Sequence, residues 1–168
     1  MVERVTAAPE HLYVEPTSDT QRVILHRLEA EVEELWSFVD TKANRQWVWI
    51  AMEADTRQIL AFYVGDRSRQ SAQAVWGKIP TRYQEQAMFY TDCYEVYKGV
   101  IPPAQHRAIT KLARKTNHVE RFNCTLRQGV SRLVRAAFLF SKKLVNHIGA
   151  IKYFICDHHL TRCAALPG

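Results

Sequence analysis

Three apolar runs separated by short polar turns constrain the fold of this chain most strongly. The runs cover residues 35–39, 47–52 and 59–64, and polar residues at 41–45 and 53–57 connect them. Each run is rich in the aromatic and branched residues that favour strands. Strands joined by such short turns pair antiparallel. The sequence therefore predicts an antiparallel three-strand meander early in the chain.

Extended and helical patterns alternate through the rest of the chain. They comprise a helix from Ser68 to about Ile79, strands over 87–91 and 107–112, and helices over about 117–136 and 141–156. Ser68 is a suitable N-cap, Pro80 ends the first helix, and apolar residues three and four apart mark the later ones. This order predicts an α/β fold of the ribonuclease-H-like type, a mixed five-stranded sheet with the antiparallel three-strand meander first and flanking helices.

The length of the chain sets the number of domains. At 168 residues, 47% of them hydrophobic, it can bury one core. We expect a partly irregular N-terminal arm over 1–30, one ribonuclease-H-like domain over 31–160 and a tail over 161–168. No apolar run reaches the roughly 18 residues of a membrane span, and the four cysteines lie far apart. These features predict a cytoplasmic protein with no membrane partner.

Charge is divided unevenly along the chain. Residues 1–60 hold eleven acids against six Lys and Arg, whereas residues 104–152 hold eleven Lys and Arg and one acid, Glu120. The basic segment favours a polyanionic partner, DNA or RNA. A lone carboxylate there is typical of a metal ligand beside bound phosphate, although an ion pair with Arg121 or Arg127 also explains it.

Acids on three separate elements are positioned to converge in this fold. Cleavage and joining of phosphodiesters by two divalent ions requires carboxylates that meet at one point. An acid on the first strand, one at the end of the fourth and one on a late helix would meet on one side of the sheet. Glu33 or Glu34, Asp92 and Glu120 occupy those places.

Each acid also has a simpler explanation. Asp92 can cap a helical turn over 94–98. A solvated surface would explain the acidic cluster of the first strand, which comprises Glu29, Glu31, Glu33 and Glu34. Glu31 and Glu34 remain alternatives to Glu33 as the first ligand.

Basic and amide side chains around Glu120 are the candidate nucleic-acid contacts. Such groups position a phosphate backbone without reading its sequence. The set comprises Lys111, Arg114, Lys115, Asn117, His118, Arg121, Asn123, Arg127, Arg135, Lys142 and Lys143. Helical geometry prevents all of them from facing one way, so part of the set is ordinary solvent-facing charge.

Several stretches resemble the transposases of the insertion sequence one family. The matching stretches are residues 34–39, 61–68, 89–92 and 116–123, continued at 127–128 and 141–143. The resemblance extends from about Leu28 to His159. It implies a ribonuclease-H-like catalytic domain with an Asp, Asp, Glu triad, in which Asp92 is the second acid and Glu120 the third. Glu33 stands where the family pattern has the first Asp.

The resemblance also implies an activity and its partners. The expected enzyme is a DNA transposase that cuts and joins strands with two Mg²⁺ or Mn²⁺ ions held by Glu33, Asp92 and Glu120. Its partners would be the double-stranded DNA of element ends and target, further copies of the chain on that DNA, and an upstream DNA-reading module. When bound to DNA it would be associated with the nucleoid.

Glu33 in place of Asp raises two rival functions. One extra methylene displaces the carboxylate by roughly 1.5 Å, a misplacement that can cost about 100-fold in rate. A catalytically decayed DNA-binding remnant is therefore one rival. A nuclease that cuts particular DNA structures without joining them is the other.

Overall fold

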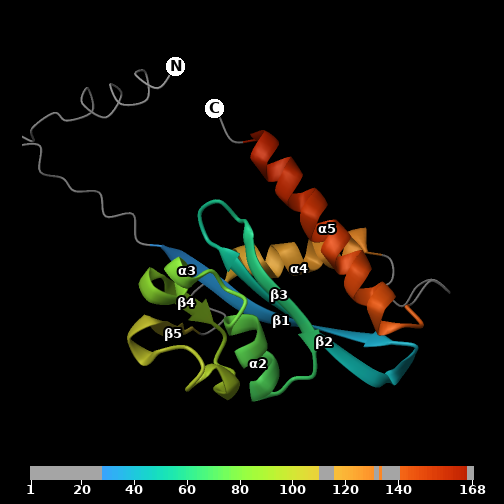
Figure 1. Ribbon diagram of the computed structural model, residues 1–168, viewed down its shortest axis with the longest axis horizontal. Coiled ribbons are helices and arrows are strands. Elements are labelled where there is room, and N and C mark those ends of the chain that lie inside the picture. Colours follow the sequence, from blue (N-terminus) through green and yellow to red (C-terminus); the bar gives the residue numbers. More distant parts are fainter. Residues whose placement is uncertain (1–27, 110–115, 131–132, 134–140, 166–168) are drawn as a thin grey trace, which may run out of the picture.

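The described residues form a sheet covered by helices on both faces (Figure 1). The computed structural model describes residues 28–109, 116–130, 133 and 141–165, with side chains as far as Arg162. Its elements are β1 (Glu29–Val39), β2 (Thr41–Glu53), β3 (Ile59–Gly65), α2 (Arg69–Trp76), α3 (Thr81–Gln86), β4 (Met88–Thr91), the short helical turns η1 (Glu95–Tyr97) and η2 (Pro103–Gln105), β5 (His106–Ala108), α4 (Asn117–Gly129) and α5 (Leu144–Ala165).

The sheet has five strands in the order β3-β2-β1-β4-β5. The first three pair antiparallel, and β4 and β5 add parallel strands beside β1. The predicted meander and the mixed five-stranded sheet are confirmed. β1 begins at Glu29, six residues before the apolar run, so Glu33 lies within the strand. Val32 pairs with Thr91 in parallel register, which places Asp92 beside Glu33 at the end of β4.

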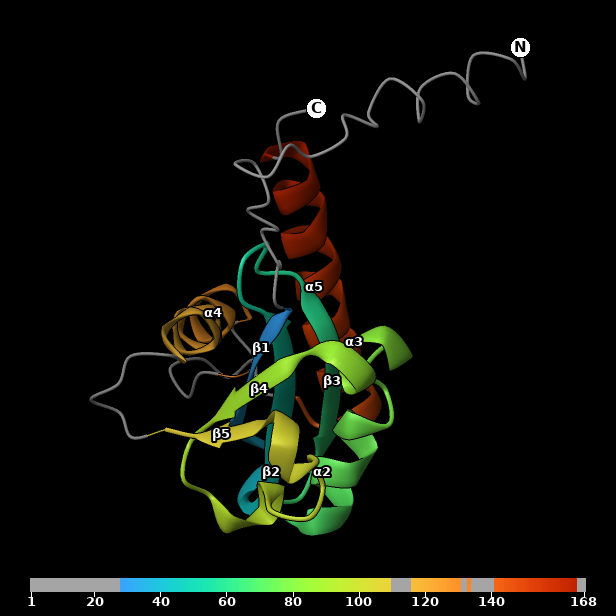
Figure 2. The same ribbon diagram turned by 90° about the vertical axis from the view of Figure 1, so that its left-hand side faces the viewer.

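Each face of the sheet packs against its own helices. Successive strand residues point to opposite faces. Leu35 packs in the cluster formed with α4 and α5, whereas Val32 packs with α2 and η1 on the other face. Figure 2 shows α4 on one side of the sheet and α2 and α3 on the other. Neighbouring residues of β1 therefore pack on opposite faces of the sheet, one against α4 and α5 and the next against α2 and η1.

The helices differ from the sequence prediction mainly at their ends. Ser68 caps α2 as expected, because its hydroxyl accepts a hydrogen bond from Ser71 N. α4 ends at Gly129 rather than near 136. A Cβ at Gly129 would collide with the Phe154 ring of α5, so glycine permits this close helix contact.

The last helix reaches further than its pattern indicated. α5 continues to Ala165, through much of the segment predicted as a tail. The domain limits at 30 and 160 remain predictions. Within the described part of the chain, no helix is both long and apolar enough to span a bilayer.

Candidate active site

Glu33 lies in the middle of β1 on the face that carries α4. Its side chain is half-buried, and Asn123 Nδ2 of α4 donates a hydrogen bond to its Oε2 at 2.8 Å. Asn123 itself is only 6% exposed. The sequence predicted Asn123 as a nucleic-acid contact, but the helix periodicity turns it toward the sheet. Its amide therefore holds a carboxylate instead of facing a surface.

The ionisation of Glu33 is affected by its burial and by neighbouring acids. Burial raises the pKa of Glu33 to about 7, and the Glu120 carboxylate is the next contributor in the same direction. Glu34 and Asp92 raise it further, while the hydrogen bond from Asn123 opposes them. Strand register and helix packing thus bring acids separated by 87 residues in sequence (120 − 33) toward the central strand β1.

We expect Glu33→Gln to stabilise the protein at high pH in the absence of divalent ions. The folded-state pKa lies above the ordinary value of 4.5. The stability associated with the protonated carboxyl is fully present below pH 4.5 and is lost as the pH rises through about 7. Urea unfolding in EDTA should show the variant more stable than the native chain by about 1–3 kcal/mol at pH 8, and nearly equal to it at pH 4.

Added Mg²⁺ provides the control for this prediction. It should raise the midpoint of unfolding of the native chain more than that of Glu33→Gln, since the amide is the poorer ligand. An advantage of the variant that does not change between pH 4 and pH 8 would mean that Glu33 does not titrate in this range.

Asp92 and Glu120 occupy the ends of their elements. Asp92 follows β4, and its Oδ1 accepts a hydrogen bond from Tyr94 N at 3.0 Å, just before η1. This bond closes a turn ahead of η1, but the N-cap of η1 is Tyr94 and no side chain caps it, so Asp92 is not the helix cap considered from the sequence. Glu120 lies in the first turn of α4, where Thr116 Oγ1 donates to its Oε1 at 3.4 Å. Both carboxylates keep oxygen lone pairs for other partners.

Glu31 orients the helix that carries Glu120. It is 2% exposed, and its Oε2 accepts hydrogen bonds from His118 N at 3.0 Å and Val119 N at 2.8 Å. A carboxylate on β1 thus caps the N-terminus of α4, where unpaired N–H groups and the helix dipole favour negative charge. The sequence offered Glu31 only as an alternative ligand. Its period-two relation to Glu33 was the signal that it faces α4.

Glu34 belongs to the opposite face of the sheet. Its carboxylate pairs with Arg67 Nη2 at 2.7 Å and accepts a hydrogen bond from the Tyr97 hydroxyl at 2.7 Å. The Arg67 guanidinium lies over the rings of Trp47 and Tyr94. With its side chain 2% exposed and fully engaged, Glu34 is a structural residue. The solvated explanation of the acidic cluster is therefore wrong for Glu31 and Glu34.

The predicted basic contacts are dispersed over the surface. Asn117 and Arg121 line a surface hollow on α4 together with Glu120, while Arg127 is exposed further along that helix. Lys142 and Lys143 precede α5, where Ser141 O accepts a hydrogen bond from Asp40 N at the β1–β2 turn. That turn is seven residues from Glu33, about 23 Å along the strand. Lys111, Arg114, Lys115 and Arg135 lie outside the described residues.

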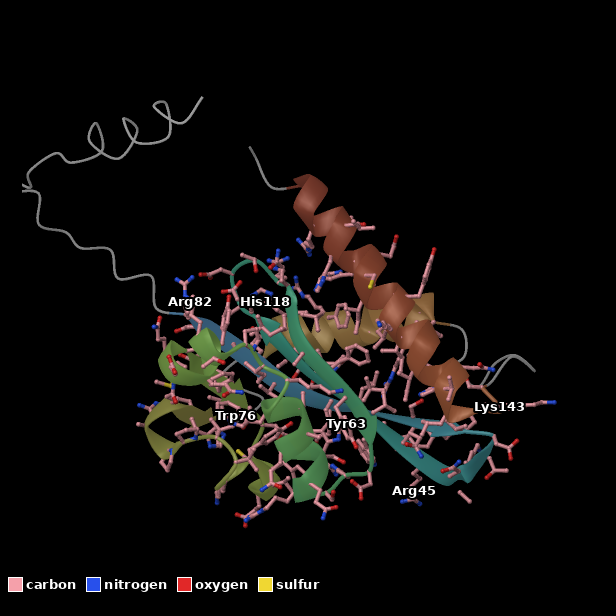
Figure 3. All side chains as sticks on the ribbon, viewed as in Figure 1. Arg45, Tyr63, Trp76, Arg82, His118 and Lys143 are labelled. Carbon is pink, nitrogen blue, oxygen red and sulfur yellow. The ribbon has the colours of Figure 1, made fainter. Side chains whose placement is uncertain are left out.

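Figure 3 shows the separation of two of these groups, His118 and Lys143. His118 lies at the start of α4, whereas Lys143 lies nearer to Arg45 and the end of the sheet where β1 and β2 are joined. Burial and the positive charge of Arg57, Arg121 and Arg162 lower the pKa of His118.

Glu33, Asp92 and Glu120 have the right chemistry to bind a divalent ion, but they do not form a preformed metal site. Within the described ranges, no three His, Cys, Asp or Glu side chains are grouped as ligands. Glu33 is bonded to Asn123 and Asp92 to Tyr94 N, and holding an ion would require them to exchange those bonds. Carboxylate oxygens are the ligands that Mg²⁺ and Mn²⁺ prefer. The electrostatic strain at Glu33 is what a cation would relieve.

Comparison with known proteins decides the family. A family model described as IS1 transposase matches residues 26–161, most of the chain. The chain belongs to the IS1 transposase family. The matched region contains every acid discussed above, so the predicted resemblance is confirmed.

Named relatives of this IS1-family chain are InsB proteins of insertion elements. The iso-IS1n protein InsB of Shigella dysenteriae is 32% identical over 130 residues, covering 76% of this chain and 94% of the relative. The IS1 protein InsB of Shigella flexneri is 28% identical, with 77% and 95% covered.

Solved structures share the fold of this IS1-family chain at low sequence identity. A chain of the simian T-cell lymphotropic virus intasome, in complex with PP2A regulatory subunit B56 gamma, matches with a TM-score of 0.56 at 9% identity. The match covers 77% of this chain and about half (47%) of that one. The HTLV-2 integrase catalytic core domain, in complex with magnesium, matches with a TM-score of 0.52 at 8% identity, covering 79% and 84%. These likenesses confirm the ribonuclease-H-like fold.

Proposed function

We propose that this chain is the catalytic domain of a DNA transposase that cleaves and joins strands through Glu33, Asp92 and Glu120. One observation carries the proposal: strand register places Asp92 beside Glu33, α4 with Glu120 packs over the same strand, and burial together with these neighbouring acids raises the pKa of Glu33. A fold gains no stability from gathering carboxylates in this way, so their proximity is typical of a site that takes a cation.

Divalent ions are the cofactor this site would take. The HTLV-2 relative in fold was solved with magnesium. When bound, such ions polarise the phosphodiester and lower the pKa of the attacking water or DNA 3′-hydroxyl. Glu33, Asp92 and Glu120 would hold them, and their separate elements would keep the carboxylates at fixed relative positions.

The surrounding residues hold these acids in place. Asn123 fixes one oxygen of Glu33 and leaves the other free, and Glu31 fixes the start of α4, on which Glu120 is carried. Asn117 and Arg121 lie beside Glu120 on the exposed side of α4, where a phosphate backbone can approach. Double-stranded DNA is thus the proposed substrate, bound by more than one copy of the chain.

The test of the proposal is divalent-dependent cleavage and joining of labelled element-end DNA. We expect products in Mg²⁺ or Mn²⁺ and none in EDTA. Glu33→Asp should change the rate about 10- to 100-fold, because one methylene moves a metal-holding carboxylate relative to its partners. A slower Glu33→Asp variant would mean that Glu33 is adapted to this site. A faster variant would mean that Glu33 marks a damaged site.

Three results would support the rival functions. Joining restored only by Glu33→Asp would identify this chain as a decayed copy with an intact fold. Cleavage without joining, by the native chain and in both metals, would favour the nuclease. DNA binding with no chemistry in any variant would favour the DNA-binding remnant and contradict the catalytic proposal.

A further inference from the structure

A basic pocket lies between α4, α5 and the β2–β3 turn, separate from the predicted acids. It measures about 270 Å³. Its lining comprises Met52, Arg57, His118, Arg121, Phe122, Thr125, His158 and Arg162. Three guanidinium groups and two imidazoles thus surround one hollow whose lining contains no acid. Segments more than 100 residues apart in sequence supply them (162 − 57 = 105).

The guanidinium groups of this pocket form no ion pair within the described part of the chain. The ion pairs of that part join Arg67 to Glu34 and Lys98 to Glu95, although the charge of Glu31 acts on Arg57 and that of Asp55 on His118. His118 Nδ1 is buried and has no described hydrogen-bond partner. Like charges brought together repel one another, and buried polar atoms normally find partners. A bound anion would reduce the repulsion between the arginines and could accept a hydrogen bond from His118 Nδ1.

The turn that presents Arg57 is held in an unfavourable backbone conformation. Arg57 has a φ of 61°, a region that favours glycine or asparagine. Thr56 donates from its N and its hydroxyl to the Glu53 carboxylate, Arg57 N donates to Glu53 O, and His158 Nε2 donates to Arg57 O at 3.1 Å. α5 and the turn thus fix an arginine where the backbone disfavours one, which is a mark of functional sites.

The pocket adjoins the surface that carries Glu120. Arg121 and Thr125 line both the pocket and the hollow on α4 that contains Glu120. Met52 at its base pairs across the sheet with Glu31, two residues from Glu33, or about 7 Å along β1. A nucleic-acid strand advances about 3.4 Å per nucleotide along its helix axis. One strand can therefore occupy the pocket and pass the predicted acids within a few nucleotides.

We propose that this pocket binds a backbone phosphate of the DNA strand that runs past Glu120, with Arg57, Arg121 and Arg162 as its ligands. This inference extends the proposed function. It rests on that function because it assumes that the bound polyanion is DNA. Phe122 and Met52 supply the apolar part of the lining, and the Phe122 ring makes a T-shaped contact with the His158 ring, 4.8 Å between centroids. Arg57, His158 and Arg162 extend the DNA surface beyond α4.

The test uses a fluorescein-labelled DNA duplex of arbitrary sequence and the full chain in EDTA. Arg57→Asn and Arg162→Gln should each raise the Kd about three- to tenfold and reduce the slope of log K against log salt by about one. Asn suits the positive φ at 57, so the melting temperature of Arg57→Asn should be unchanged or higher. Arg69→Gln, on α2 at the opposite face, is the matched control and should alter neither quantity.

The possible outcomes are separable. Native Kd and slope in both pocket variants would overturn the inference. Inorganic phosphate that raises the melting temperature of the native chain but not of Arg162→Gln, with DNA affinity equal in the two, would assign the pocket to a free phosphate and overturn it too. Weaker DNA binding in both variants supports the pocket even where no divalent-dependent cleavage is found, since binding is measured without metal.

Discussion

Glu120→Gln should reduce both cleavage and joining by roughly 1,000-fold or more while leaving the fold intact. The amide occupies the same volume in the first turn of α4 and can still accept the Thr116 hydroxyl. It lacks the charge that a divalent ion requires. The rates are to be measured with labelled element-end DNA in Mg²⁺, and the unfolding midpoint should change little.

DNA binding separates this effect from a general loss of function. Removal of a negative charge from the basic face should leave the Kd for duplex DNA unchanged or lower it, because phosphate repulsion is relieved. Glu85→Gln, an exposed position of α3 on the other face, is the matched control and should retain full activity. Glu120→Gln that retains a tenth of native activity would rule out Glu120 as a metal ligand.

Glu31→Ala should destabilise the protein by about 2–4 kcal/mol and lower its activity more than tenfold. The change leaves the N–H groups of His118 and Val119 without their acceptor and opens a cavity beside α4. Because α4 carries Glu120, a shifted helix start displaces that carboxylate. Denaturant unfolding gives the free energy, and hydrogen exchange at the amides of His118 and Val119 reports the lost cap.

Glu31→Gln is the control for this prediction. Its amide oxygen can still accept both helix N–H groups, so it should lose less stability than Glu31→Ala and retain more activity. Glu31→Ala within about 0.5 kcal/mol of the native chain, with unchanged exchange at these amides, would show that α4 is held by its apolar contacts alone.

The predictions for Glu120 and Glu31 have different origins. The first came mainly from the sequence and the second from the structure. Asp92 and Glu120 could be proposed as site residues from the sequence because each stands alone, one at the tip of an apolar strand and one in a basic segment. Glu31 and Asn123 gave no such signal. Their roles depend on which side of β1 and α4 they face once these elements are packed together.

The acidic cluster of β1 shows the same division within one strand. Four acids lie within six residues, from Glu29 to Glu34, and composition cannot separate them. Strand alternation sends Glu31 and Glu33 toward α4 and sends Glu34 toward Arg67 and Tyr97. A one-residue change in register would exchange these roles. Telling apart the proposed ligand, the helix cap and the structural ion pair therefore required the sheet.

The sequence by itself determined the order of the elements, the mixed sheet and the family, because strand and helix periodicities and short motifs are local properties of the chain. Only the tertiary structure decided how Glu33 is held by Asn123, how Glu31 caps α4, and how Arg57 and Arg162 reach one pocket with Arg121. These groups are far apart in sequence, and packing of α4 and α5 against the sheet brings them together. Contacts between residues so far apart in the chain produce no periodic pattern in the sequence.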